Sequence, residues 1–414
     1  MSCIETEANT KSKHVPLCEC QGTAMTGRER FLRIARAELT GDLFLPFNFN
    51  YSWFMEETIE RWKREGLPED ADLAEHFGLD RVEFAGGKPY GLVPPFEEKV
   101  LSEDKETVVV RDEDGITKRV FKRYADSKMP QWLDHPVKSR SDFRELMKRL
   151  DPYSPGRFPS DLDQRKEMWK WRDYPLGVGP GSFYGHTLQK WVGTEHLCML
   201  FYDDPNFVHE MLDYLEWFFL GLLKRLLPGA PVVRPLLKGP RDCSGPRLTS
   251  EVPPDGQDKR SLFDFASFGE DIAFKGRSFM SPGMFREFIQ PHYVSICRLL
   301  RSHGIEVIFV DSDGYLGELI PLWMAVGING FSPLEVAAGM DARDLKKKYG
   351  KDIVLAGNVD KRALIRGKAE IDREVDKVKE LLDVGGYFPA VDHSIPPDVP
   401  YGNFQYFLST LRSL

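Results

Sequence analysis

Four polar residues in the second half of the chain each follow a short apolar run. They are Asp311, Asp313, Glu335 and His393. Each run has the length and composition of a buried β-strand. Parallel strands end at one edge of a sheet or barrel, where the chemistry of such folds usually lies. Three carboxylates and an imidazole at that edge could together hold a divalent metal. The spacing therefore predicts a metal site at these four residues.

Other polar and aromatic residues are candidates for contact with a substrate. Asn358 and Asp360 lie in a turn after another apolar run, and Tyr184 lies in a glycine-rich turn. Asn50 and Trp53 lie in an aromatic-rich stretch after the first predicted strand, at residues 43–47. We interpret all five as candidate substrate-binding residues, with turn hydrogen bonds or the hydrophobic core as the structural alternative.

His186 follows the same glycine-rich turn and is a candidate proton donor to a leaving oxygen. Asp311 and Asp313 flank a turn, so helix capping is the alternative role for them. Asp392 precedes His393 and could orient its imidazole.

The elements that must position these residues alternate between strands and helices from about residue 175 onward. The predicted strands cover residues 176–179, 232–234, 262–265, 305–310, 328–331, 353–356 and 387–391. The predicted helices include residues 205–227, 282–303, 316–326, 341–349 and 370–384. This repetition predicts an α/β protein whose parallel strands close into a (β/α)₈ TIM barrel. An open doubly wound sheet is the alternative, but no glycine-rich dinucleotide fingerprint follows an early strand.

The first half of the chain predicts additions to this barrel. Residues 1–23 have few apolar side chains and predict a disordered leader, followed by one domain over residues 24–414. Thr26 and Glu29 have capping-box spacing at the start of a helical region, which we expect to run to about residue 39. Residues 107–111 and 116–121 flank an Asp-Gly turn and predict a hairpin insertion over one end of the barrel. Residues 228–260 read as a long loop at the barrel rim.

Composition excludes several classes of protein. The chain has 414 residues, a net charge of −8 and an isoelectric point near 5.7, which argues against a nucleic-acid-binding surface. It has neither a long uncharged apolar segment nor a secretory signal pattern. The six cysteines are scattered, so we expect a reducing, cytoplasmic location.

Several segments resemble the uroporphyrinogen decarboxylase superfamily, which includes the decarboxylase and corrinoid-linked methyltransferases. The resemblance runs from about Met25 to the C-terminus. Its motifs are residues 25–31, the glycine-rich turn 179–185, residues 281–291, the Gly-Asn-Val-Asp turn 357–360 and residues 395–403. It implies a TIM barrel, and it marks Asp271 as an acidic residue that could contact or protonate a substrate.

The resemblance is nearer to the methyltransferase branch. The arginine-rich segment that binds substrate carboxylates in the decarboxylase corresponds here to residues 46–53, which contain no arginine. The methyltransferases hold zinc with a His-x-Cys pair and a later Cys. These positions correspond to Asp311, Asp313 and His393, and Glu335 matches a further ligand of related methionine synthases.

Because both thiolates are missing, the ligand set consists of chemically hard oxygen atoms and one imidazole nitrogen. It suits oxygen-ligated zinc first, with manganese, iron or magnesium as alternatives. The resemblance therefore implies a metal-assisted methyltransferase that moves a methyl group between an O- or N-methyl substrate, or a pterin, and a corrinoid protein. Methylcorrinoid or tetrahydrofolate would carry the methyl group, and a separate corrinoid carrier protein would be the partner.

Two alternatives stay open. The first is a decarboxylase on a smaller acid, with Asp271 or Asp313 as proton donor and Arg234, Arg241 and Arg247 as the cationic pocket. The second is a non-catalytic barrel that only binds a ligand.

Overall fold

The computed structural model describes residues 25–46, 54–86, 89–122, 130–227 and 261–414. The predicted leader, the predicted strand at residues 232–234 and the predicted rim loop lie outside these ranges. Asn50, Trp53 and the three arginines of the decarboxylase alternative also lie outside them, so their proposed roles stay predictions.

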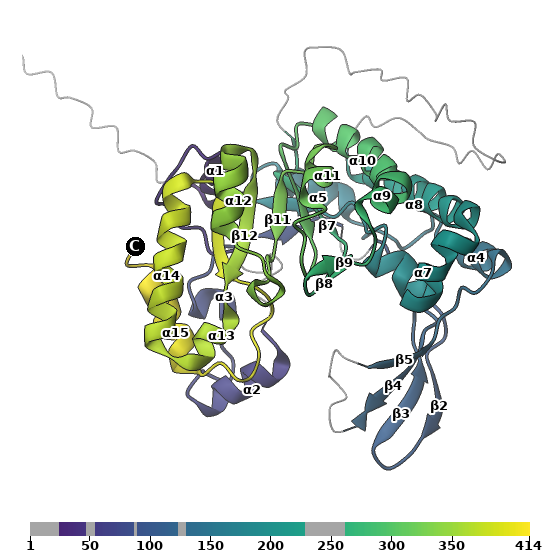
Figure 1. Ribbon diagram of the computed structural model, residues 1–414, viewed down its shortest axis with the longest axis horizontal. Helices are drawn as coiled ribbons and strands as arrows, with labels where there is room; N and C mark the ends of the chain where they lie inside the picture. Colours follow the sequence, from purple (N-terminus) through teal and green to yellow (C-terminus); the bar gives the residue numbers. More distant parts are fainter. Residues whose placement is uncertain (1–24, 47–53, 87–88, 123–129, 228–260) are drawn as a thin grey trace, which may run out of the picture.

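The centre of the molecule is a sheet of seven parallel strands in the order β1-β6-β7-β10-β11-β12-β13 (Figure 1). Its strands are β1 (Glu83–Phe84), β6 (Leu176–Val178), β7 (Phe265–Gly269), β10 (Val307–Asp311), β11 (Gly330–Ser332), β12 (Val354–Val359) and β13 (Tyr387–Val391). Because all pairings are parallel, the carboxyl ends of these strands lie at one edge. That edge carries every site residue predicted in the described ranges.

Helices connect most of these strands. They are α1 (Gly27–Ala35), α2 (Glu56–Arg64), α3 (Leu73–His76), α4 (Arg140–Met147), α5 (Leu162–Trp169), α6 (Lys190–Val192), α7 (Thr194–Asp203), α8 (Pro205–Leu226), α9 (Pro282–Met284), α10 (Gln290–Ser302), α11 (Ile320–Met324), α12 (Ala342–Tyr349), α13 (Lys361–Arg366), α14 (Lys368–Val384) and α15 (Tyr401–Leu411). Parallel strands require such crossovers, and the helices bury the apolar outer face of the sheet.

The sheet has the order and curl of a TIM-barrel-like fold, but closure into eight strands is not part of the described structure. Two isolated parallel bridges lie at the two edges of the sheet. Pro46 pairs with Asp80 just before β1, and Phe54 pairs with Ile395 just after β13. Among the described residues of the strand predicted at residues 43–47, Pro46 forms this bridge, and Pro46 and Phe54 line one hollow beside β13.

Aromatic side chains fill the inside of the curved sheet near its amino end. Phe31 of α1 stacks on Phe388 with ring centroids 4.9 Å apart and contacts Phe265 at 5.3 Å. Phe44 and Phe309 belong to the same buried cluster. The capping box of Thr26 and Glu29 starts α1 as predicted, which fixes the helix that supplies Phe31. The helix ends at Ala35 rather than near residue 39.

The predicted hairpin is part of a larger sheet. Strands β3 (Thr107–Arg111) and β4 (Thr117–Phe121) pair as expected, but β2 (Lys99–Glu103) and β5 (Gln131–Asp134) extend them to four antiparallel strands. Every residue of β2 and β5 is exposed, so these strands lack the alternation of apolar and polar residues that predicts strands. Figure 1 shows the sheet projecting from the body, which corrects the prediction that it lies over one end. The turn between β3 and β4 contacts the main body, because Asp114 forms an ion pair with Lys190 of α6.

Gly357→Ala should destabilise the protein strongly. Gly357 has φ +108°, and a Cβ there would overlap the carbonyl oxygen of Pro333. We expect a loss of about 3 kcal/mol or more in the free energy of unfolding, measured by urea denaturation. Gly402→Ala is the matched control, because Gly402 lies exposed in α15 with nothing within 4 Å of the new methyl group. The control should gain about 0.5–1 kcal/mol. Equal stability of Gly357→Ala and the wild type would contradict the close approach of these strands.

Candidate functional site

Three of the four predicted metal ligands lie together at the carboxyl ends of the strands. Asp313 follows β10, Glu335 follows β11 and His393 follows β13. One ligand atom from each lies within 4.8 Å of the other two. The closest pair is His393 Nε2 and Asp313 Oδ2, 3.0 Å apart. Glu335 accepts a hydrogen bond from the backbone N–H of Gly314 at 2.9 Å, which joins its loop to that of Asp313.

Asp311, the fourth predicted ligand, is not part of that three-residue group. It is the last residue of β10, and its carboxylate accepts a 3.3 Å hydrogen bond from the Ser332 hydroxyl. Removal from water raises the pKa of Asp311 well above its ordinary value, and the nearby Asp271 and Asp313 carboxylates add to the shift. Its role as a metal ligand stays a prediction, because the clustered ligand atoms come from Asp313, Glu335 and His393.

His393 is held by its acidic neighbour. The hydrogen bond with Asp313 raises the pKa of His393 above its ordinary value, against the effects of burial and of the Lys361 ammonium group, which both lower it. The imidazole thus carries a proton more readily than a free histidine would. A metal that binds here would have to displace that proton.

Asp392 ties together the loops that follow β11, β12 and β13, two of which carry Glu335 and His393. Its buried carboxylate accepts one hydrogen bond from the N–H of Val336 and another from the N–H of Lys361, each at 3.0 Å. Val336 follows Glu335, and Lys361 follows β12. Asp392 therefore positions its neighbours through the backbone, whereas its predicted role was to orient His393 directly.

A pair of one aspartate and one histidine lies beside this group. Asp271 follows β7, and its Oδ2 lies 3.3 Å from His186 Nε2. Its Oδ1 also accepts the N–H of Asp313 at 3.4 Å. Burial raises the pKa of Asp271, His186 opposes the shift and Asp313 adds to it. The structure thus brings the three predicted catalytic residues, Asp313, Asp271 and His186, into one connected cluster.

Glu270, which the sequence reasoning missed, holds the glycine-rich turn against this cluster. Its carboxylate is fully buried. It accepts hydrogen bonds from the backbone N–H groups of Phe183 and Tyr184 and from the hydroxyl groups of Tyr293 and Ser182. The turn continues directly into His186. A buried acidic residue immediately before Asp271 at a strand end was the available signal.

Stability should fall as pH rises because of Glu270. Burial raises the pKa of Glu270 to about 7, against its four hydrogen bonds, which lower it. The ordinary value is 4.5, so the folded chain holds one more proton than the unfolded chain between these two values. Glu270 therefore disfavours folding by an amount that grows to roughly 3 kcal/mol across that window. Urea denaturation at several pH values measures this effect. As pH rises, the free energy of unfolding should fall less steeply in Glu270→Gln than in the wild type. Parallel curves for wild type and variant would contradict this assignment.

Three predicted substrate-binding residues have partners within the protein. The Asn358 side chain bonds the carbonyl groups of Leu334 and Met340 and the N–H of Ala342, all within 3.0 Å. Asp360 caps α13 and pairs with Arg362. Tyr184 is only 1% exposed and stacks on Phe279. These contacts are of the kind that the structural alternatives describe, and the predicted substrate contacts stay predictions.

The donor atoms of the three-residue group fit a divalent metal. One ligand atom from each residue lies within 4.8 Å of the other two. Two carboxylates and an imidazole suit zinc, manganese or iron. Asp313, Glu335 and His393 would hold such an ion.

Comparisons with known proteins relate part of this chain to one family. The model of the family "Uroporphyrinogen decarboxylase (URO-D)" matches residues 271–414. A uroporphyrinogen decarboxylase of Campylobacter lari is 27% identical over 158 residues, which are 38% of this chain and 42% of that protein. One of Gloeobacter violaceus is 24% identical over 135 residues, which are 33% of this chain and 38% of that protein. These matches support the resemblance of this chain to the uroporphyrinogen decarboxylase superfamily. They span less than half of either relative.

The superfamily match begins at Asp271 and contains Asp311, Asp313, Glu335 and His393. His186 and the glycine-rich turn lie before it, although Asp271 and Glu270 contact them. Among the described residues, no helix is both long and apolar enough to cross a membrane.

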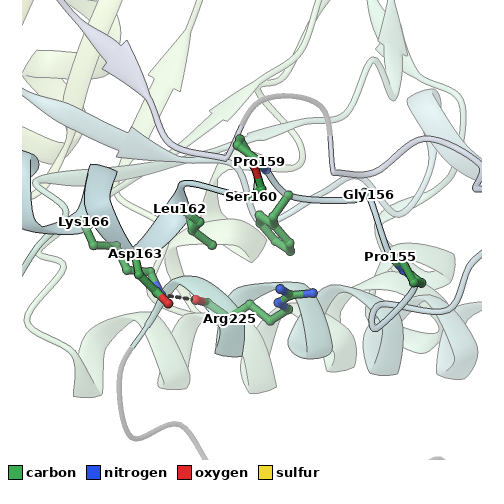
Figure 2. A pocket seen from close by; sticks show the side chains of 9 residues that line it. Pro155, Gly156, Pro159, Ser160, Leu162, Asp163, Lys166 and Arg225 are labelled. Carbon is green, nitrogen blue, oxygen red and sulfur yellow. Dashed lines mark hydrogen bonds and ion pairs between the residues drawn. The ribbon is translucent and has the colours of Figure 1, made fainter.

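Two other features lie apart from this rim. Asp213 and Glu216 of α8 and His292 of α10 form a second acidic and imidazole group, in which His292 Nδ1 lies 2.6 Å from Glu216 Oε2. A cavity of about 580 Å³ lies between the segment that leads into α5 and the end of α8 (Figure 2). Lys166 bridges its two sides by donating to the carbonyl group of Arg225. The cavity shares no residue with the predicted site, so it does not enter the chemistry argued below.

Proposed function

We propose that this protein transfers a methyl group from an O- or N-methyl substrate to a corrinoid carrier protein, with a divalent metal held by Asp313, Glu335 and His393. The observation that carries the proposal is the convergence of these three ligand atoms within 4.8 Å at one sheet edge. No thiolate belongs to that group, so an oxygen or nitrogen substrate fits better than a thiol. Tetrahydrofolate is the other methyl carrier that the proposal allows.

The division of roles follows from position. A bound metal would act as a Lewis acid on the heteroatom that carries the methyl group. Asp313, Glu335 and His393 would hold that ion, with Asp392 fixing the loops of Glu335 and His393 through the backbone. Asp271 and His186 lie beside the group and would supply a proton to the heteroatom as the methyl group departs.

The test is an anaerobic assay with cob(I)alamin and a set of methyl ethers, methylamines and methyl thioethers, with and without Zn²⁺ or Mn²⁺. We expect metal-dependent formation of methylcobalamin from ethers or amines. Rapid formation of methylcobalamin from methyl thioethers, with no reaction of oxygen or nitrogen donors, would contradict the proposal.

Decarboxylation is the second candidate, and a specific observation favours it. Asp271 and Asp311 have raised pKa values, which suit carboxyl groups that donate a proton. Release of CO₂ from carboxylic acids by metal-free protein would support this function instead.

A further inference from the structure

Lys361 places a positive charge against the candidate metal group. It is the first residue of α13, two residues after the end of β12. Its Nζ lies 3.9 Å from Glu335 Oε1, and each of these side chains is 22% exposed. The hydrogen bond from its backbone N–H to Asp392 fixes where the side chain starts. Within the described part of the chain, Lys361 is the only lysine or arginine that forms an ion pair with Asp271, Asp311, Asp313 or Glu335.

The ammonium group of Lys361 is held by charge rather than by hydrogen bonds. A separation of 3.9 Å is too long for a hydrogen bond, and the described residues provide no other acceptor for this Nζ. Lys346 shows the contrast, because its buried Nζ donates to the Ile353 carbonyl oxygen at 2.6 Å. A half-buried ammonium group without acceptors keeps its donors available to an incoming anion.

A metal bound by Glu335 would change the partner of Lys361. Both cations would face the same carboxylate from a few ångströms apart, so they would compete for it. Because Lys361 also acts on His393, its charge extends over the group. Once the metal holds Glu335, the ammonium group needs another anion nearby.

We propose that Lys361 is the anion-binding element of this site, paired with Glu335 until a metal takes that carboxylate. The inference rests on the proposed function and narrows its substrate to methyl ethers or amines that carry a carboxylate or similar anionic oxygen. Lys361 binds that oxygen while the metal group binds the heteroatom. Its positive charge also offsets the repulsion that the acidic cluster exerts on such a substrate.

The first arm of the test measures the affinity for Mn²⁺ alone by isothermal titration calorimetry at low salt. Lys361→Met should bind Mn²⁺ about tenfold more tightly than the wild type, because a like charge near Glu335 is removed. Lys361→Arg keeps the charge and should resemble the wild type. Lys351→Met is the matched control, since it removes an exposed lysine at the opposite end of β12.

The second arm measures benzoate binding to the Mn²⁺-loaded proteins. The wild type and Lys361→Arg should bind benzoate about tenfold more tightly than Lys361→Met. Equal Mn²⁺ affinity in the wild type and Lys361→Met, or equal benzoate affinity, would overturn the role of Lys361 and leave the metal group intact. Absence of Mn²⁺ binding in every variant would instead overturn the proposed function as well.

Discussion

Glu270→Ala should lower the free energy of unfolding by about 3 to 5 kcal/mol, or prevent folding at 37 °C. The carboxylate is fully buried and accepts from two backbone N–H groups and two hydroxyl groups. Alanine would leave those donors without partners and open a cavity between the glycine-rich turn and α10. Each unsatisfied buried donor costs about 1 to 3 kcal/mol, and relaxation of the turn recovers part of that.

Two variants make the Glu270 measurement specific. Tyr293→Phe removes only one of the four donors and should cost about 1 kcal/mol. Glu287→Ala removes an exposed carboxylate before α10 and should change stability by less than about 0.5 kcal/mol. Chemical denaturation at pH 6 compares all four proteins. A Glu270→Ala variant as stable as Glu287→Ala would show that the turn is not held by this carboxylate.

Asp313→Ala should reduce metal-dependent methyl transfer by more than about a hundredfold. Asp313 contributes one of three clustered ligand atoms and the hydrogen bond that holds His393. Loss of groups that merely orient a metal ligand already costs about 10- to 100-fold, so loss of a ligand should cost more. The measurement is the initial rate of methylcobalamin formation at saturating Mn²⁺.

Glu318→Ala is the matched control for Asp313, because it removes an exposed carboxylate from the same loop. It should keep the wild-type rate. If Asp313→Ala retains that rate too, the cluster does not take part in the reaction.

The site was predictable from the sequence to the extent that it depends on strand ends. Asp313, Glu335 and His393 follow apolar runs, and the parallel sheet gathers their loops at one edge. What the runs do not reveal is which way each side chain turns. Asp311 and Asp313 are two residues apart, yet Asp311 bonds to Ser332 while Asp313 faces His393. Only the geometry after the strand end separates them.

Glu270, which was missed, and Asp392, whose backbone partners were not predicted, act through contacts between segments far apart in sequence. Glu270 bonds to residues 182–184 and to Tyr293, and Asp392 bonds to the N–H groups of Val336 and Lys361. No local pattern encodes those partners. The strands β2 and β5 were missed for a different reason, because both faces of each are exposed and the apolar alternation is absent.

Metal content tests the central claim most directly. The wild type and His393→Ala would each be purified without chelator, incubated with equal Zn²⁺ and Mn²⁺, dialysed, and measured by elemental mass spectrometry. A metal group at Asp313, Glu335 and His393 predicts about one ion per wild-type chain and a large loss in the variant. Equal metal content in the two proteins, or none in either, would contradict it.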